Sequence, residues 1–456
     1  MKNYSLVPDA RNLMESTRSI GYSLPAAVAD IIDNSIAARA SEVQVSSPFL
    51  PSRRFLSILD DGCGMSEEEL LVAMKYGSRL VDEERQKSDL GRFGLGLKMA
   101  SLSQCRRLTV VSKKSGKICG ACWDLDHVAE SEEIWPLQLL DEEDLGAVPS
   151  FASLDKQKSG TLVVWEKLDI LLQGIEESSK SALQVLASRM VELKKHLSLV
   201  FHRYIEGKDG SALRICFNGQ MLSPMDPFLV GSSTCPFAED AFELAGEKIR
   251  YQAYVLPHPG QMTPEQREAA GDLQRDQGFY IYRNRRLVIW GTWFRLSRKQ
   301  ALSKLARVRV DVPASVELDR IWSLDVKKSS AFVPEELKDG LRAVVERLGE
   351  RSSNVWRKRA RKEQAGDEAF WRRTERPDGT VLYEFNETNT ALNELFQRCP
   401  EARMVLRLAA SRLPLDSLYM DLAQEKTVDV ADGARMEDML AALRKRWGLT
   451  AEANKN

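Results

Sequence analysis

Ala29-Asp30-Ile31-Ile32-Asp33-Asn34-Ser35 is the stretch that decides the fold, and two further motifs follow it in the sequence. The second motif is Leu59-Asp60-Asp61-Gly62-Cys63-Gly64-Met65, and the third is Gly91-Arg92-Phe93-Gly94-Leu95-Gly96-Leu97-Lys98. Acidic pairs and glycine-rich turns occur singly in many soluble proteins, so each motif alone is a weak signal. Their order and spacing make them informative.

The first motif lies in a predicted helix. Apolar residues recur across it with helical spacing, and Ser23 with Pro25 supplies a start signal. Asp30 and Asn34 are one turn apart on this helix and therefore share a face. A carboxylate beside an amide oxygen suits Mg²⁺ and a polarised water, because Mg²⁺ takes oxygen ligands and keeps several waters and substrate phosphates. A solvated acidic helix face is the alternative.

The second motif follows a predicted buried strand, the apolar run 55–59, which ends in Asp60 and a glycine turn. Ser66 opens the next helix, and Glu69 completes a capping box with it. A carboxylate at a strand end, beside glycines that let a ligand approach, can accept a hydrogen bond from an exocyclic amine such as that of adenine. A simple Asp-Gly turn is the alternative.

The third motif places three glycines just before a predicted helix that starts at Leu97. Backbone N–H groups at a helix N-terminus bind phosphate oxygens, and Lys98 adds positive charge there. The spacing does not match a dinucleotide-binding fingerprint, because residues 81–89 before it are charged and loop-like rather than a strand. We interpret 81–89 as a lid over a triphosphate, although an ordinary surface loop fits the same residues.

Taken in this order, the three motifs resemble the ATP-binding core of the GHKL superfamily (gyrase, cytosolic chaperone ATPases, histidine kinases and MutL), most closely its MORC and MutL branch. The resemblance implies an α+β protein. It implies a Bergerat-type α/β sandwich over residues 1–205 and an S5-like transducer domain over 206–335. A helical C-terminal region with a basic linker is expected over 336–456. The second domain is expected to include the strand 213–217 and an Asn218-Gly219 hairpin turn.

The resemblance also implies roles for single residues. Asn34 is expected to be the Mg²⁺ ligand, and Asp60 to be the carboxylate that binds adenine. Asp30 stands where much of the family has a glutamate general base, and its side chain is one methylene shorter, so slow hydrolysis or ATP binding without turnover stays open. Lys327 or Lys328 is expected to reach the γ-phosphate. The remaining ATP-binding candidates are Gly62, Gly64, Met65, Gly91, Arg92, Phe93, Gly94, Leu95, Gly96, Leu97, Lys98 and Thr161.

A basic and aromatic stretch over 277–310 holds nine Lys or Arg residues and no acid. Such a stretch is typical of a nucleic-acid contact, although a basic face can also meet an acidic protein partner. Strand alternation predicts that part of its aromatic set is core. The DNA-binding candidates are Arg283, Arg285, Arg286, Arg295, Arg298 and Lys299.

Composition sets outer limits on function. The 456 residues carry a formal net charge of −1, so any nucleic-acid contact must come from a local patch. Seven cysteines suit a reducing compartment, and Cys119 with Cys122 lacks a second pair for a zinc site. No secretory signal or long apolar run is present, so we expect a soluble cytoplasmic protein without a membrane segment.

The predicted function is an ATP-gated dimeric clamp, with ATP and Mg²⁺ as cofactors, that acts on DNA as its MORC and MutL relatives suggest. Residues 1–25 are candidates for a dimer strap, and the C-terminal helices for a protein partner. By analogy with bacterial relatives, the pathway is restriction or phage defence. The alternatives are a chaperone-like or adaptor ATPase that acts on a protein partner, and an ATP-binding switch with little turnover.

Overall fold

The computed structural model describes residues 7–19, 21–48, 54–76, 96–172, 175, 179–208, 210–235, 237–322, 333–364, 369–375 and 381–411. The chain divides into two compact units, Met1–Val355 and Trp356–Asn456. Helices are combined with mixed sheets, so the predicted α+β class is confirmed. Gly91 to Leu95, Lys327 and Lys328 lie outside the described residues.

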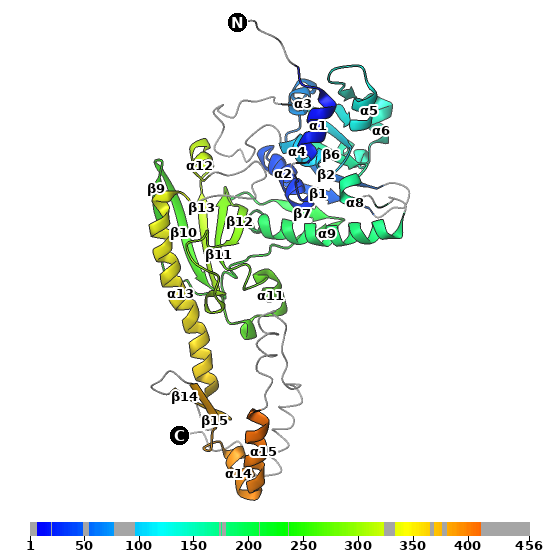
Figure 1. Ribbon diagram of the computed structural model, residues 1–456. Helices are drawn as coiled ribbons and strands as arrows, with labels where there is room; N and C mark the ends of the chain where they lie inside the picture. Colours follow the sequence, from blue (N-terminus) through cyan, green and yellow to red (C-terminus); the bar gives the residue numbers. More distant parts are fainter. Residues whose placement is uncertain are drawn as a thin grey trace. The chain divides into compact units, whose positions relative to one another are not determined.

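The first sheet has eight strands in the order β5-β4-β3-β6-β2-β1-β7-β8 (Figure 1). Its neighbours pair antiparallel except β1 and β7, which are parallel. The predicted strands at 43–45, 55–59, 108–111 and 161–165 are all present. The bounds are β1 (Glu42–Ser46), β2 (Phe55–Asp60), β3 (Arg107–Lys114), β4 (Lys117–Asp124), β5 (Gln138–Leu139), β6 (Gly160–Glu166), β7 (Arg214–Phe217) and β8 (Gln220–Met221).

The sequence suggested that the strand at 213–217 belongs to the second domain, and this prediction was wrong. The strand is β7, and it extends the first sheet by pairing with β1 from Glu42 opposite Arg214 to Val45 opposite Phe217. The predicted boundary after residue 205 therefore divides this sheet. The expected hairpin turn is present between β7 and β8, with left-handed φ values of +46° at Asn218 and +78° at Gly219.

Helices cover both faces of the first sheet. The larger core lies beneath α2, α4 and α9, and a smaller cluster lies beneath α6 and α7. Helix α2 begins as predicted, because Ser23 Oγ accepts a hydrogen bond from the Ala26 amide and Pro25 occupies the first turn. The bounds are α1 (Ala10–Arg18), α2 (Leu24–Ala37), α3 (Glu67–Met74), α4 (Gly96–Leu102), α5 (Leu125–Glu130), α6 (Glu142–Ala147), α7 (Phe151–Asp155), α8 (Asp169–Leu172), α9 (Lys180–Val200) and α10 (His202–Glu206).

The second sheet has the order β12-β11-β13-β10-β9, with β11 and β13 parallel and its other neighbours antiparallel. Every residue of β11 is buried, so its aromatic side chains pack into the core on both faces rather than alternating with exposed positions. Helix α9 contacts β12, so it lies between the two sheets (Figure 1). The strand bounds are β9 (Asp240–Leu244), β10 (Glu247–Val255), β11 (Gly278–Arg283), β12 (Arg286–Thr292) and β13 (Ala306–Val312).

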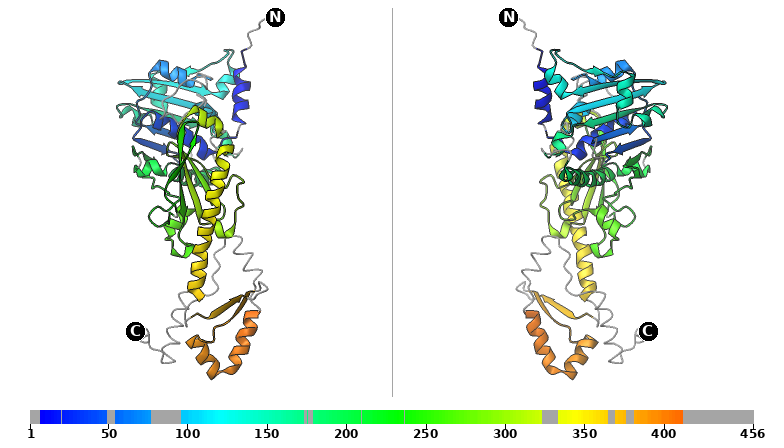
Figure 2. Two further views of the ribbon diagram at one scale, coloured as in Figure 1. Left: turned by 90° about the vertical axis from the view of Figure 1, so that its left-hand side faces the viewer. Right: turned by 90° about the vertical axis from the view of Figure 1, so that its right-hand side faces the viewer.

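Helix α13 spans Glu335–Gln364. Its residues up to Val355 belong to the first unit, where the helix runs along the second sheet (Figure 2). Its buried face includes Leu337, Leu341 and Leu348, and a Cβ at Gly340 would meet the Phe242 ring at 2.6 Å. This close approach explains a glycine inside the helix. The remaining short helices of the unit are η1 (Pro259–Gln261), α11 (Pro264–Ala270), η2 (Ala301–Ser303) and α12 (Val316–Ile321).

The described part of the second unit contains the end of α13, a β-hairpin and two further helices. Strand β14 (Trp371–Glu375) pairs antiparallel with β15 (Val381–Phe385), and the rings of Trp371 and Phe385 stack at 4.5 Å. The predicted helical region with its basic linker therefore also holds strands, which a cross-strand aromatic pair stabilises. Helices α14 (Thr390–Arg398) and α15 (Pro400–Ser411) follow. Over the described ranges of both units, no helix combines the length and apolarity that crossing a membrane requires.

Candidate nucleotide site

The Asp60 carboxylate lies at the end of β2 and is 6% exposed. Its Oδ2 accepts a hydrogen bond from Ser35 Oγ at 2.9 Å. Its Oδ1 accepts from the amides of Gly62 at 2.9 Å and Thr161 at 3.2 Å. A carboxylate offers about four acceptor positions. Three described donors fix this one in place and leave it able to accept a bond from a ligand amine.

The ionisation of Asp60 is balanced between opposing effects. Burial raises the pKa of this carboxyl, and the hydrogen bonds from Gly62, Ser35 and Thr161 oppose the rise because they favour the charged form. The net pKa is raised. Acidification through that raised pKa would protonate the acceptor oxygen at a higher pH than in an exposed aspartate.

Asp30 and Asn34 differ in their exposure on α2. Asp30 is 5% exposed, and its Oδ2 accepts a hydrogen bond from Tyr22 Oη at 3.2 Å. Asn34 is exposed although Asp33 and Ser35 on either side of it are buried. The helix therefore directs one amide away from the core and holds one carboxylate beneath the surface.

The residues present fit a magnesium ion. The exposed Asn34 amide oxygen is a hard donor of the kind that Mg²⁺ prefers. Within the described ranges, no three His, Cys, Asp or Glu side chains gather into a metal cluster. A single protein oxygen suits an ion that takes its other ligands from phosphates and water.

The turn after Asp60 is held against β3. Gly64 has a left-handed φ of +67°, and a Cβ there would lie 2.0 Å from the Lys113 carbonyl oxygen. The Met65 amide donates to Ser112 Oγ at 2.8 Å, and Ser112 Oγ also lies 3.0 Å from Thr161 Oγ1. Backbone packing thus requires glycine at 64, independently of any bound nucleotide.

Gly64→Ala is expected to destabilise the first unit by about 2 kcal/mol or more, because the left-handed conformation alone costs about 1 kcal/mol or more and the backbone contact adds to it. Gly116→Ala is the matched control, since Gly116 has a φ of +79° but open space around its Cβ position. Denaturant unfolding of both variants measures the difference. Equal losses would show that the contact with Lys113 carries no cost.

Lys98, predicted to contact phosphate, is buried and hydrogen-bonded to the protein. Its side chain is 1% exposed, and Nζ donates to the Ala73 carbonyl oxygen at 2.7 Å in the last turn of α3. The ammonium also lies 6.0 Å from the centre of the Tyr76 ring. Helix C-terminal carbonyls lack intrahelical partners and attract positive charge, which accounts for this placement. Helix α4 begins at Gly96, one residue before the predicted start at Leu97.

Two of the six candidate DNA-binding residues are interior. Arg283 Nε pairs with Asp319 Oδ1 at 2.9 Å, and Arg286 Nε pairs with Asp33 Oδ2 at 3.0 Å, with side-chain exposures of 9% or less in both pairs. Both arginines are thereby removed from the predicted surface patch. The guanidinium of Arg285 lies 4.2 Å from the centre of the Tyr204 ring.

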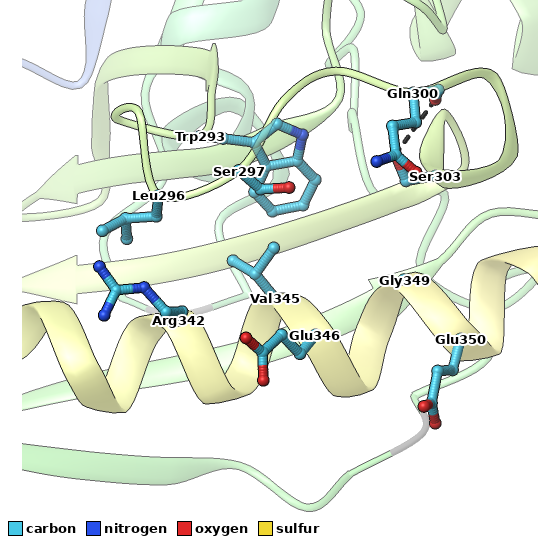
Figure 3. Close-up of a pocket in the computed structure, with 10 residues that line it drawn as sticks. All are labelled: Trp293, Leu296, Ser297, Gln300, Ser303, Arg342, Val345, Glu346, Gly349 and Glu350. Carbon is cyan, nitrogen blue, oxygen red and sulfur yellow. Dashed lines mark hydrogen bonds between the residues drawn. The ribbon is translucent and has the colours of Figure 1, made fainter.

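The exposed candidates Arg295, Arg298 and Lys299 lie on the loop that follows β12. Gln277 holds this loop, because its Oε1 accepts from Trp293 Nε1 at 3.2 Å and from Ser303 Oγ at 2.8 Å. A cavity of about 290 Å³ separates the loop from α13 (Figure 3). The loop is therefore anchored at its base and exposes Arg295 and Arg298, whereas the exposed Lys299 donates through Nζ to the Arg275 carbonyl oxygen. The cavity is lined by Trp293, Leu296, Ser297, Gln300, Ser303, Arg342, Val345, Glu346, Gly349 and Glu350.

The hydroxyls that hold the acids were missed at the sequence level. Ser35 binds Asp60 across 25 positions, and Tyr22 binds Asp30 across eight. Ser35 stands inside the first motif, so its place on the sheet-facing side of the helix was a usable signal. Nothing in the sequence separates Tyr22 or Ser112 from other polar core residues.

The range of residues that holds this candidate site matches a known protein family. Residues 22–161 match the family described as histidine kinase-, DNA gyrase B- and HSP90-like ATPase. A segment of 107 residues is 31% identical to ATPase morc-1 of Caenorhabditis elegans, and it covers 24% of this chain and 12% of that protein. The chain thus carries a GHKL ATPase domain that is distantly related to a MORC ATPase, and the matched range runs from Tyr22 to Thr161.

Proposed function

We propose that this chain is a magnesium-dependent ATPase of the GHKL type that closes as a dimeric clamp on DNA. The observation that carries the proposal is the fixed Asp60 carboxylate, held by Ser35, Gly62 and Thr161 within the matched domain. In this proposal the first sheet is a Bergerat-type sandwich and the second an S5-like transducer. The predicted domains 1–205, 206–335 and 336–456 then need one change, because the first sheet reaches Met221.

The proposal gives each side chain of the site a role in nucleotide binding. Asp60 accepts a hydrogen bond from the adenine amine, and Thr161 keeps that carboxylate oriented. Asn34 holds Mg²⁺, which when bound supplies positive charge to the phosphate oxygens. The glycine motif at 91–96 surrounds the phosphates, and Lys327 or Lys328 contacts the γ-phosphate.

Hydrolysis is assigned to Asp30. Its carboxylate takes a proton from a water that attacks the γ-phosphorus, while the bond from that phosphorus to the bridging oxygen breaks and ADP leaves. The Tyr22 hydroxyl, 3.2 Å from Oδ2, fixes the orientation of the base. The short and buried aspartate also favours a second candidate function, an ATP-binding switch with little turnover.

The DNA contact is assigned to the exposed loop residues Arg295, Arg298 and Lys299. Burial of Arg283 and Arg286 makes the patch smaller than the sequence suggested. A smaller patch keeps the chaperone-like or adaptor alternative in place, in which a protein partner raises turnover. Dimerisation through residues 1–25, a protein partner for the C-terminal helices and a role in bacterial defence belong to the same proposal.

ATP hydrolysis measured with and without duplex DNA, over a salt series, tests the clamp. We expect DNA to raise the rate of ATP turnover, and we expect this stimulation to fall steeply as the salt concentration increases. A non-hydrolysable analogue should double the molecular mass of the protein in solution. Turnover that ignores DNA but rises with a protein client would select the chaperone-like alternative. Binding without turnover would select the switch.

Charge reversal tests the patch directly. Changing Arg295, Arg298 and Lys299 to Glu should remove about three phosphate contacts and lower the salt dependence of DNA affinity accordingly. The matched control changes Lys156, Lys158 and Lys208, which are exposed elsewhere, by the same total charge. Equal losses in both variants would assign binding to net charge, and no loss in the first would remove the patch.

A further inference from the structure

A buried ion pair connects the helix of the nucleotide site to the second sheet. Arg286 Nε lies 3.0 Å from Asp33 Oδ2 and 3.1 Å from Oδ1, and the two side chains are 5% and 1% exposed. Asp33 directly precedes Asn34 on α2, whereas Arg286 is the first residue of β12. The pair therefore spans the boundary between the two layers of the unit.

We propose that Arg286 is a positioning residue that couples the second sheet to the Mg²⁺ ligand Asn34 through Asp33. This inference rests on the proposed ATPase function and deepens it. Asp33 and Asn34 are consecutive on one rigid helix, so a rotation of α2 that moves the exposed amide also moves the buried carboxylate. In this proposal a shift of β12 changes nucleotide affinity, and by the reciprocity of linked equilibria nucleotide binding changes β12 with the same coupling free energy.

Two contacts besides Asp33 also hold the guanidinium of Arg286, one from β12 and one from the end of α9. Arg286 Nη1 donates to the Leu287 carbonyl oxygen at 2.8 Å, and the guanidinium lies 5.6 Å from the centre of the Phe201 ring. The tight turn before it has left-handed φ values of +48° at Asn284 and +68° at Arg285, as a two-residue hairpin requires. The position of the Arg286 guanidinium therefore depends on the position of β12.

The titratable side chain of His196 does not compete with Arg286 for the Asp33 carboxylate. His196 on α9 faces Arg286, and its pKa is lowered to about 3 by burial and by the arginine charge. The imidazole is therefore neutral near pH 7 and adds no competing positive charge.

A buried ion pair of this kind need not add net stability. Desolvating two charges costs several kcal/mol, and apolar residues of similar volume often replace a buried ion pair without loss of stability. Removing one partner alone leaves the other charge buried and unpaired, which is strongly destabilising. A double replacement by apolar residues therefore separates coupling from folding.

The test compares Asp33→Leu/Arg286→Met with the matched control Arg283→Met/Asp319→Leu in full-length protein. The control removes a second buried Arg–Asp pair from the same hairpin, one that joins α12 instead of α2. We expect both double variants to fold, as checked by denaturant unfolding. The first should bind a fluorescent ATP analogue with Mg²⁺ about 10-fold more weakly, the scale of a typical coupling energy, and the control should bind as wild type.

Hydrogen exchange supplies a second measurement, which would not change if the Asp33–Arg286 pair only stabilised the fold. In wild type the analogue should increase protection of amides in 278–292, and this response should vanish in Asp33→Leu/Arg286→Met but persist in the control. Wild-type affinity and an intact exchange response in the first variant would overturn the coupling. If the first variant does not fold, Arg286→Lys takes its place under the same two criteria. Absence of analogue binding in wild type would instead refute the proposed ATPase function.

Discussion

Asn34→Ala is expected to abolish magnesium-dependent ATP binding while leaving the fold intact. The side chain is exposed on a helix whose neighbouring positions Asp33 and Ser35 are buried, so it contributes little to packing. Alanine is also the better helix former. Loss of the one protein oxygen assigned to Mg²⁺ should raise the Kd for Mg-ATP by about 100-fold or more, since even groups that only orient metal ligands cost up to about that factor.

Calorimetric titration with ATP in Mg²⁺ and in a chelator checks this expectation. The effect should be large in Mg²⁺ and small in the chelator, because adenine recognition by Asp60 does not involve Asn34. Gln184→Ala, which removes an exposed amide from α9, serves as the control for losing a helical amide. Equal affinity of wild type and Asn34→Ala in Mg²⁺ would remove Asn34 as the metal ligand.

Local sequence patterns were sufficient for the parts of the site that local structure determines. Ser23 and Pro25 start α2, and the capping box of Ser66 and Glu69 starts α3, as predicted. Asp60 ends β2 as the apolar run before it indicated. In each case the signal and its consequence lie within a few residues of each other, where backbone hydrogen bonding sets the outcome.

Long-range pairing could not be predicted in the same way. Strand β7 joins β1 across more than 160 positions, and either sheet was compatible with its apolar pattern. Arg286 finds Asp33 across 253 positions, so a run of arginines that resembled a surface patch is partly interior. Lys98 likewise donates to the Ala73 carbonyl oxygen in α3, a contact that its place beside the glycine motif did not indicate. The sequence shows which side chains are charged, but it does not show which groups they contact in the folded protein.

Two of the hydroxyl contacts were also missed because they join residues far apart in the sequence. Ser35 and Ser112 are ordinary residues whose contacts form only when α2 packs on β2 and β3 pairs with β6. Tyr22 contacts Asp30 over only eight positions, but no motif separates it from other polar residues. The acids were recognised because a family motif preserves their spacing. Their supporting donors have no such motif.

Asp30→Asn is expected to stop turnover and keep ATP binding. The substitution preserves shape and removes the basic oxygen, and a positioned general base contributes about 10²- to 10⁴-fold to a rate. We therefore expect kcat to fall by about 100-fold or more. Because Asp30 contacts the water rather than the nucleotide in the proposed mechanism, the Kd of a non-hydrolysable analogue should stay within about threefold of wild type.

Tyr22→Phe separates orientation of the base from its basicity. This variant removes only the hydroxyl 3.2 Å from Asp30 Oδ2 and leaves the carboxylate in place. A fall in kcat smaller than that of Asp30→Asn, with unchanged analogue affinity, is the expected result in single-turnover measurements. Undiminished turnover in Asp30→Asn would exclude Asp30 as the base. Tight ATP binding with no turnover in wild type would show that the shorter acid has turned the site into a nucleotide switch, since every other group of the pocket would then be working as assigned.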